Sequence, residues 1–139
     1  MEINNLPETL GLAIPTYGRT SELNQLLESI WIQQNIPEKI IIIDQNEVGF
    51  LDQVIIRWSS KLPIEHHRVR FKSASKARNL GANLLRTDII AFPDDDCIFT
   101  NDTVGKIKVA FHINPLADII IGKKKRSSSS HPGEDDRAC

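Results

Sequence analysis

Three consecutive carboxylates, Asp94, Asp95 and Asp96, directly follow the apolar run at residues 89–93. Like charges this close repel, because a unit pair at about 4 Å costs roughly 1 kcal/mol in water and roughly 4 kcal/mol at an effective dielectric near 20. Side chains alternate along an extended segment, so we expect Asp94 and Asp96 to point to one side and Asp95 to the other. Paired carboxylates at a strand end are typical of Mg²⁺ or Mn²⁺ sites, and a solvated acidic turn is the alternative.

Two other segments carry groups that could contact a ligand. Asp44 closes a run of four isoleucines. Its carboxylate could accept hydrogen bonds from a base or a ribose, and capping of the next helix is the alternative. The turn after the first apolar run contains Pro15, the hydroxyls of Thr16 and Tyr17, and the cation of Arg19. An ordinary tight turn is the alternative there.

A basic segment leads into the helix predicted over residues 73–85. Lys76 and Arg78 lie near the start of that helix, where unpaired backbone amides add a partial positive charge. This combination favours binding of an anion at the start of the helix, whereas Arg68 and Arg70 are expected to lie on a basic surface that faces solvent. Acidic and basic clusters at one edge suit a diphosphate that a divalent cation bridges to the carboxylates.

Apolar runs alternate with helical patterns along the chain, with Thr20 or Ser21 as the expected cap of the first helix. The predicted strands span residues 10–15, 40–43, 63–67, 89–92 and 119–121, and the predicted helices lie near residues 23–31, 51–58, 73–85 and 104–111. This alternation predicts an α/β, Rossmann-like fold with a mostly parallel sheet and helices on both faces. In such sheets, ligands bind outside the carboxyl ends of the strands, where the acidic and basic segments would meet.

Composition indicates one soluble globular domain. Hydrophobic residues make up 40% and charged residues 25% of the 139 residues, and the net charge is −1, so nothing attracts the chain as a whole to nucleic acid. No signal peptide or membrane-spanning run is recognisable, which favours the cytoplasm. We assign residues 1–122 to the domain and residues 123–139 to a low-complexity tail for which we predict disorder. The basic run 123–126 favours peripheral contact with anionic lipid at the inner face of the membrane, although a solvated run is commoner.

Four segments in order resemble the family 2 glycosyltransferases with the GT-A fold: AIPTYGRTSELNQLLESI, EKIIIIDQN, SKARNLGANLLRTDIIAF and PDDDC. The second ends in an aspartate that resembles the nucleotide-contacting residue of the family, and the last resembles its Asp-x-Asp motif. The resemblance implies transfer of a sugar from a nucleoside-diphosphate donor to a hydroxyl of a glycan, lipid-linked or other acceptor, with assistance from Mg²⁺ or Mn²⁺.

The resemblance also implies roles for individual residues. Gly18 stands where many members have Asn, and Pro93 where Leu is usual. The nucleoside would contact Thr16, Tyr17 and Asp44, and Arg78 would lie near the base or the diphosphate. The full set of predicted donor contacts is Pro15, Thr16, Tyr17, Arg19, Asp44, Lys76, Arg78, Asp94 and Asp95, and the predicted metal ligands are Asp94 and Asp96.

The chain is short for this family, whose members continue into an acceptor-binding half that supplies the catalytic base. We therefore expect a truncated, donor-binding half. Glu134 and Asp135 resemble the late Glu-Asp base motif and are the candidate catalytic residues, with a solvated acidic tail as the alternative. The alternative function is a catalytically incomplete remnant that binds nucleotide sugars. A phosphoryl-receiver domain needs an acid pair after the first strand, and a nicotinamide-binding domain needs G-x-G-x-x-G; the sequence has neither at that place.

Overall fold

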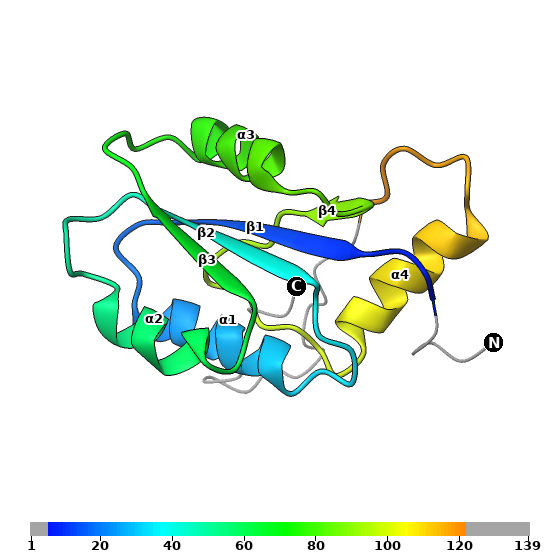
Figure 1. Ribbon diagram of the computed structural model, residues 1–139, viewed down its shortest axis with the longest axis horizontal. Coiled ribbons are helices and arrows are strands. Elements are labelled where there is room, and N and C mark those ends of the chain that lie inside the picture. Colours follow the sequence, from blue (N-terminus) through cyan, green and yellow to red (C-terminus); the bar gives the residue numbers. More distant parts are fainter. Residues whose placement is uncertain (1–5, 122–139) are drawn as a thin grey trace, which may run out of the picture.

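The computed structural model describes residues 6–121, so the tail at 123–139 lies outside the described residues. Within that range, strands and helices alternate: β1 (Leu10–Thr16), α1 (Ser21–Trp31), β2 (Lys39–Asp44), α2 (Asp52–Ser59), β3 (Ile64–Arg68), α3 (Ala74–Leu84), β4 (Ile89–Ala91) and α4 (Thr103–Ile113). The strands form one sheet in the order β3-β2-β1-β4, and every neighbouring pair is parallel. Helices α1 and α2 cover one face of the sheet and α3 covers the other, which confirms the predicted α/β architecture (Figure 1).

The two central strands are buried because their side chains are apolar on both faces. All four isoleucines of β2 have no exposed surface. One set of alternating side chains packs with α1 and α2, and the other packs with α3. The register places Thr16 opposite Asp44 and Asp44 opposite Arg68, so β1, β2 and β3 end together. Side chains that follow these strands therefore gather at a single edge.

Helix α3 lies close to the sheet through small residues. Ala77 and Gly81 are buried, whereas Ala74 is exposed. A Cβ atom at Gly81 would stand 2.6 Å from the Cβ of Ala13 on β1. The close spacing between α3 and β1 therefore depends on glycine, which has no side chain, at position 81.

Replacing Gly81 by valine should destabilise the domain by about 2–3 kcal/mol, because the added side chain forces α3 away from Ala13. Urea denaturation followed by circular dichroism measures this loss. Asn83→Val is the matched control, since Asn83 is on the same helix but exposed. Equal denaturation midpoints for the two variants would contradict the close-packing argument.

One local prediction is wrong, and another is right only in the position of the residue. Residues 119–121 form no strand in the described part of the chain, and Ile119 and Ile121 are exposed. A three-residue apolar run forms a strand only when a neighbour pairs with its backbone. Thr20 is the residue before α1, but its side chain makes no capping hydrogen bond. Between residues 6 and 121, no helix has the length and the apolar character needed to cross a membrane.

Candidate functional site

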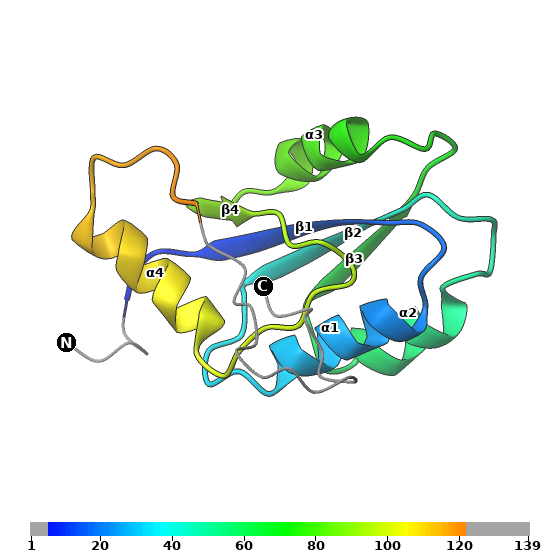
Figure 2. The same ribbon diagram turned by 180° about the vertical axis from the view of Figure 1, so that it is seen from behind.

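A cavity of about 420 Å³ opens at the carboxyl edge of the sheet. The segment after β4 runs toward the carboxyl ends of the other strands before it turns back to α4 (Figure 2). The acidic triplet belongs to this segment and lines the cavity. The lining residues are Pro15, Tyr17, Arg19, Gln45, Ala74, Arg78, Asp94, Asp95 and Asp96. The structure therefore brings together the β1 turn, the start of α3 and the acidic triplet, as the sequence predicts.

Three predicted contacts do not line the cavity. Thr16 and Asp44 are buried at the ends of β1 and β2. The hydroxyl of Thr16 has no hydrogen-bond partner. Lys76 is exposed on α3, and its ammonium lies 6.0 Å from the ring centroid of Phe71. Thr16 and Asp44 are therefore buried beside the lining residues Pro15, Tyr17 and Gln45, Lys76 is not among the residues that line the cavity, and contacts of all three with a donor stay predictions.

The acidic triplet is partly neutralised by two arginines, Arg19 from the loop after β1 and Arg78 from α3. Nη1 of Arg19 lies 2.7 Å from Oδ1 of Asp95 and 3.1 Å from Oδ2 of Asp96. Nη2 of Arg78 lies 3.4 Å from Oδ1 of Asp94, and both residues line the same cavity as the first pair. The three carboxylates and two guanidiniums that line the cavity leave one net negative charge.

The expected alternation of the three carboxylates is wrong. Strand β4 ends at Ala91, and the backbone turns at Asp95 and Asp96. Asp95 and Asp96 consequently converge on one guanidinium nitrogen, whereas Asp94 contacts a different arginine. A turn cancels the two-residue alternation of side chains that holds only for an extended backbone.

The ion pair of Arg19 is the stronger of the two by geometry and burial. Asp95 is buried, and its hydrogen bond from Arg19 raises the pKa of that guanidinium above its usual value. The pair between Arg78 and Asp94 is longer and largely solvent-exposed, so we expect it to contribute little on its own. Arg19 is therefore anchored at the buried Asp95, whereas Arg78 makes only a long, exposed contact to the acidic triplet.

The loops after β1 and β2 are held together by a chain of hydrogen bonds. The backbone N–H of Gly18, at a φ of 71°, donates to Oδ1 of Asn46 over 2.6 Å. Asn46 in turn donates from its backbone and its side chain to Oδ1 of Asp44, over 2.9 and 2.8 Å. Nε2 of His66 lies 2.9 Å from the other oxygen of Asp44. The buried carboxylate thus orients the turn that carries Tyr17 and Arg19.

The start of α3 is positioned by a residue that sequence reasoning missed. Oε1 of Gln45 accepts the backbone N–H of Ser73 over 2.6 Å, and the hydroxyl of Ser73 accepts the N–H of Lys76 over 3.3 Å. These bonds place the first turn of α3 at the cavity, where Ala74 and Arg78 line it. The polar pair that follows the β2 aspartate in the sequence was the available signal for both Gln45 and Asn46.

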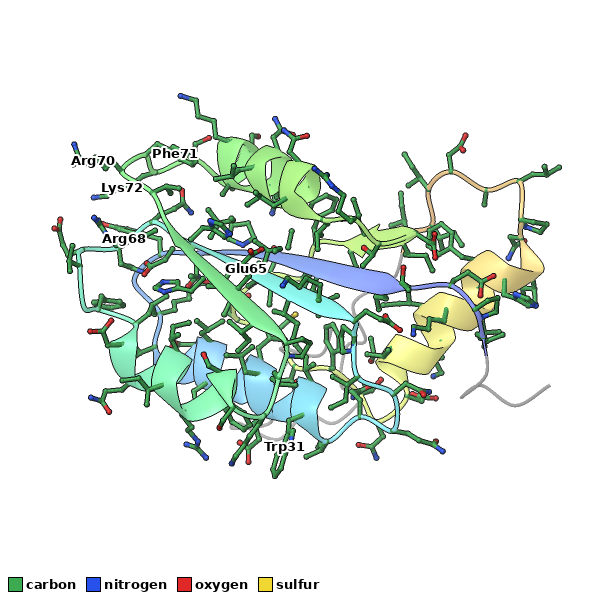
Figure 3. All side chains as sticks on the ribbon, in the orientation of Figure 1. Trp31, Glu65, Arg68, Arg70, Phe71 and Lys72 are labelled. Carbon is green, nitrogen blue, oxygen red and sulfur yellow. The ribbon has the colours of Figure 1, made fainter. Side chains whose placement is uncertain are left out.

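Other cations of the basic segment surround the connection from β3 to α3, as Figure 3 shows for Arg68, Arg70 and Lys72. Arg68 and Arg70 are exposed, as expected for a solvated face. The ammonium of Lys72 lies 4.7 Å from the ring centroid of Tyr17. Interaction with the Tyr17 hydroxyl raises the pKa of Lys72. The phenol at the cavity wall therefore has a cationic neighbour.

The donor chemistry of the site fits a divalent cation. Asp94 and Asp96 offer carboxylate oxygens from side chains that are 69% and 39% exposed. Among residues 6–121, no three His, Cys, Asp or Glu side chains converge as a complete metal site. Mg²⁺ is commonly held by one or two carboxylates together with water and the phosphates of a substrate. Asp94 and Asp96, whose arginine partners differ, can each offer a carboxylate to that kind of open site.

Comparison with solved structures identifies the fold. The S. aureus protein TarS (residues 1–349), in complex with UDP-GlcNAc, matches with a TM-score of 0.73 at 20% identity, over 91% of this chain and 37% of that chain. The mannosyltransferase PcManGT of Pyrobaculum calidifontis, in complex with GDP-Man and Mn²⁺, matches with a TM-score of 0.66 at 17% identity, over 76% of this chain and 33% of that chain. The α/β sheet is therefore of the GT-A type.

Sequence comparison identifies the family. A protein of Haemophilus influenzae named as an uncharacterized glycosyltransferase is 29% identical over 112 residues, which span 80% of this chain and 37% of that protein. The glycosyl transferase family 2 profile matches residues 12–134, a range that includes Glu134, although Glu134 and Asp135 lie outside the described residues. The chain belongs to glycosyl transferase family 2.

Proposed function

We propose that this chain binds a nucleoside-diphosphate sugar with a divalent cation, as the donor half of a glycosyltransferase. The observation that carries the proposal is the cavity at the carboxyl edge of the sheet, where acidic and cationic side chains line one space. Carboxylates alone repel a diphosphate, and guanidiniums alone need no metal. Both together suit a diphosphate and a cation bound side by side. The TarS complex with UDP-GlcNAc and the PcManGT complex with GDP-Man and Mn²⁺ support this choice of ligand.

In this proposal, three segments contact different parts of the donor and its cation. Asp94 and Asp96 hold the cation, which when bound neutralises charge on the departing diphosphate. Arg78, near the start of α3, pairs with the diphosphate, because guanidinium N–H groups match phosphate oxygens. The exposed ring of Tyr17 lies at the cavity wall and offers a face for the base. The acceptor hydroxyl would lose its proton to a carboxylate, for which Glu134 and Asp135 remain the candidates.

Donor binding without transfer is the second candidate function. Each carboxylate that lines the cavity has an arginine partner, so none stands ready as a general base. A base needs a free carboxylate within hydrogen-bond reach of the acceptor hydroxyl. The alternative is therefore a domain that holds the nucleotide sugar and leaves the chemistry to another segment or partner.

Calorimetric titration of the 139-residue chain with UDP-GlcNAc and GDP-mannose tests the donor site. We expect binding of at least one donor with Mn²⁺ and little binding after chelation with EDTA. Donor hydrolysis and transfer to added hydroxyl acceptors are then followed with labelled sugar. Binding with neither turnover would favour the second candidate. The donor-site proposal fails if neither these nucleotide sugars nor their free nucleoside diphosphates bind.

Replacing Asp44 by alanine should weaken nucleotide binding equally with and without Mn²⁺. The variant loses the acceptor for both donors of Asn46, which loosens the turn that carries Tyr17 and Arg19. Each buried donor left unsatisfied costs about 1–3 kcal/mol, so the unfolding midpoint in urea should fall as well. Glu65→Ala on β3 is the control, since Glu65 does not line the cavity. An effect that appears only with Mn²⁺ would instead assign Asp44 to the cation.

The proposed acceptors are glycan, lipid-linked or other hydroxyl compounds, as in polysaccharide biosynthesis. We place the activity in the cytoplasm, where nucleotide sugars would be available, with the basic run 123–126 as a contact to the inner face of the membrane. Co-sedimentation with vesicles that contain anionic lipid tests this contact.

A further inference from the structure

Arg19 already contacts one of the two carboxylates assigned above to the cation. A single nitrogen, Nη1, contacts Oδ1 of Asp95 and Oδ2 of Asp96. Asp96 is one of the two carboxylates assigned above to the cation, so the guanidinium already neutralises a prospective metal ligand. A divalent ion that binds Asp96 would stand next to a positive charge, and like charges at this range repel.

The two partners of Arg19 differ in exposure, and this difference gives the side chain an anchor and a releasable contact. The Asp95 side chain is 9% exposed, whereas the Asp96 side chain is 39% exposed and 3.1 Å from the same nitrogen. Both contacts use Nη1, and a guanidinium carries five N–H donors. Arg19 can therefore leave Asp96, stay bonded to Asp95, and turn its other N–H groups into the cavity that it lines.

Charges around Arg19 are consistent with such an exchange. Asp95, Asp96 and, at longer range, Glu22 all face the guanidinium and attract it. A cation at Asp94 and Asp96 would reverse the sign of the net charge that lines the cavity. The guanidinium then gains by contact with an anion instead of contact with Asp96. A diphosphate is the anion that the proposed function places in this cavity.

We propose that Arg19 is a positioning residue that exchanges Asp96 for the diphosphate when the cation binds. The proposal rests on the proposed function and adds a mechanism to it: Arg19 weakens binding of the cation alone and strengthens binding of cation and diphosphate together. Coupling between two ligands is reciprocal. The factor by which the cation raises the affinity for the nucleotide must therefore equal the factor by which the nucleotide raises the affinity for the cation. An empty site would then discriminate against free divalent ions.

The test uses the 139-residue chain and two separate titrations. Free Mn²⁺ is measured by electron paramagnetic resonance without nucleotide, and UDP and GDP are titrated by calorimetry with and without saturating Mn²⁺. Arg19→Gln removes the charge, and Arg19→Lys keeps the charge but loses the planar fork. Arg57→Gln is the matched control, because Arg57 lies on α2 over the ring of Trp58 and does not line the cavity.

Arg19→Gln should bind Mn²⁺ alone about five- to tenfold more tightly than wild type, and should bind the nucleotide about tenfold more weakly in the presence of Mn²⁺. Arg19→Lys should keep the wild-type affinity for Mn²⁺ alone and lose affinity for the nucleotide. Arg57→Gln should match wild type in both titrations. Circular dichroism checks that each variant is folded, and the lysine variant tests the nucleotide contact if the glutamine variant unfolds.

Two results would overturn the exchange. An unchanged or weaker affinity of Arg19→Gln for Mn²⁺ alone would show that Arg19 does not compete with the cation. If Arg19→Gln bound Mn²⁺ more tightly but kept the wild-type affinity for the nucleotide, Arg19 would repel the cation without contacting the diphosphate. A wild-type chain that binds neither UDP nor GDP at any Mn²⁺ concentration would instead refute the proposed function itself, and the exchange with it.

Discussion

An aspartate in place of Ile42 is expected to unfold the domain. Ile42 has no exposed surface and lies in β2, between β1 and β3. Its side chain belongs to the cluster that packs with α1 and α2. A carboxylate there would have neither water nor a partner. The free-energy cost of burying this unpaired charge is far larger than the stabilisation that the isoleucine side chain contributes. We expect a loss of at least about 5 kcal/mol, which is the total stability of many small domains.

Far-UV circular dichroism at 25 °C and the thermal transition measure this effect. Val48→Asp provides the matched control, because it also replaces a β-branched apolar side chain by a carboxylate, at a loop position that is 76% exposed. We expect a wild-type spectrum and a wild-type transition for the control. A cooperative transition near that of wild type for Ile42→Asp would mean that β2 is not the centre of the core.

The sheet was predictable because β2 and its neighbours contain strong, local patterns. Four consecutive isoleucines can be buried only in a strand that is covered on both faces, and the structure covers them with α1 and α2 on one side and α3 on the other. The apolar stripe at Leu23, Leu26, Leu27 and Ile30 likewise reports one buried helix face. These features depend on neighbours in sequence, so the sequence alone contains them.

The failed predictions depend on features that a local hydrophobic pattern does not contain. Residues 119–121 have the composition of a strand, but a strand also requires a pairing edge that composition does not specify. The direction of each carboxylate in the acidic triplet depends on a turn at Asp95 and Asp96, which a period of two misses. Local pattern gives the type of an element more reliably than it gives the point where the element ends.

The site was predictable as a set of chemical groups and not as a network. The acidic triplet, Arg19 and Arg78 do line one cavity. Their pairing depends on two loops that are tied by Asn46 and Gln45, whose partners lie on other segments of the chain. The burial of Asp44 beneath Asn46 and His66 was also unforeseen, because a terminal aspartate of a strand can face either solvent or a neighbouring loop.

Replacing Asp96 by alanine is expected to abolish cation-dependent donor binding while the fold remains intact. The side chain is part of a turn at the cavity and is 39% exposed, so its removal leaves the core unchanged. The proposed cation would retain Asp94 alone, and we expect donor affinity with Mn²⁺ to fall by at least about 100-fold, or roughly 3 kcal/mol. Asp118→Ala, which removes an exposed carboxylate after α4, should leave the affinity unchanged.

The dependence of this loss on Mn²⁺ distinguishes two roles for Asp96, because its carboxylate also contacts Arg19. If Asp96 acts only by holding Arg19, the variant should lose the same factor in donor affinity with Mn²⁺ and with EDTA. If Asp96 binds the cation, the loss should appear only with Mn²⁺, and affinity in EDTA should equal that of wild type or rise slightly, because Arg19 is then released toward the diphosphate. Asp96→Asn retains an oxygen but not the charge, so its donor affinity with Mn²⁺ should lie between that of wild type and that of Asp96→Ala. Calorimetry of the three proteins under both conditions therefore assigns Asp96 to the cation or to the arginine.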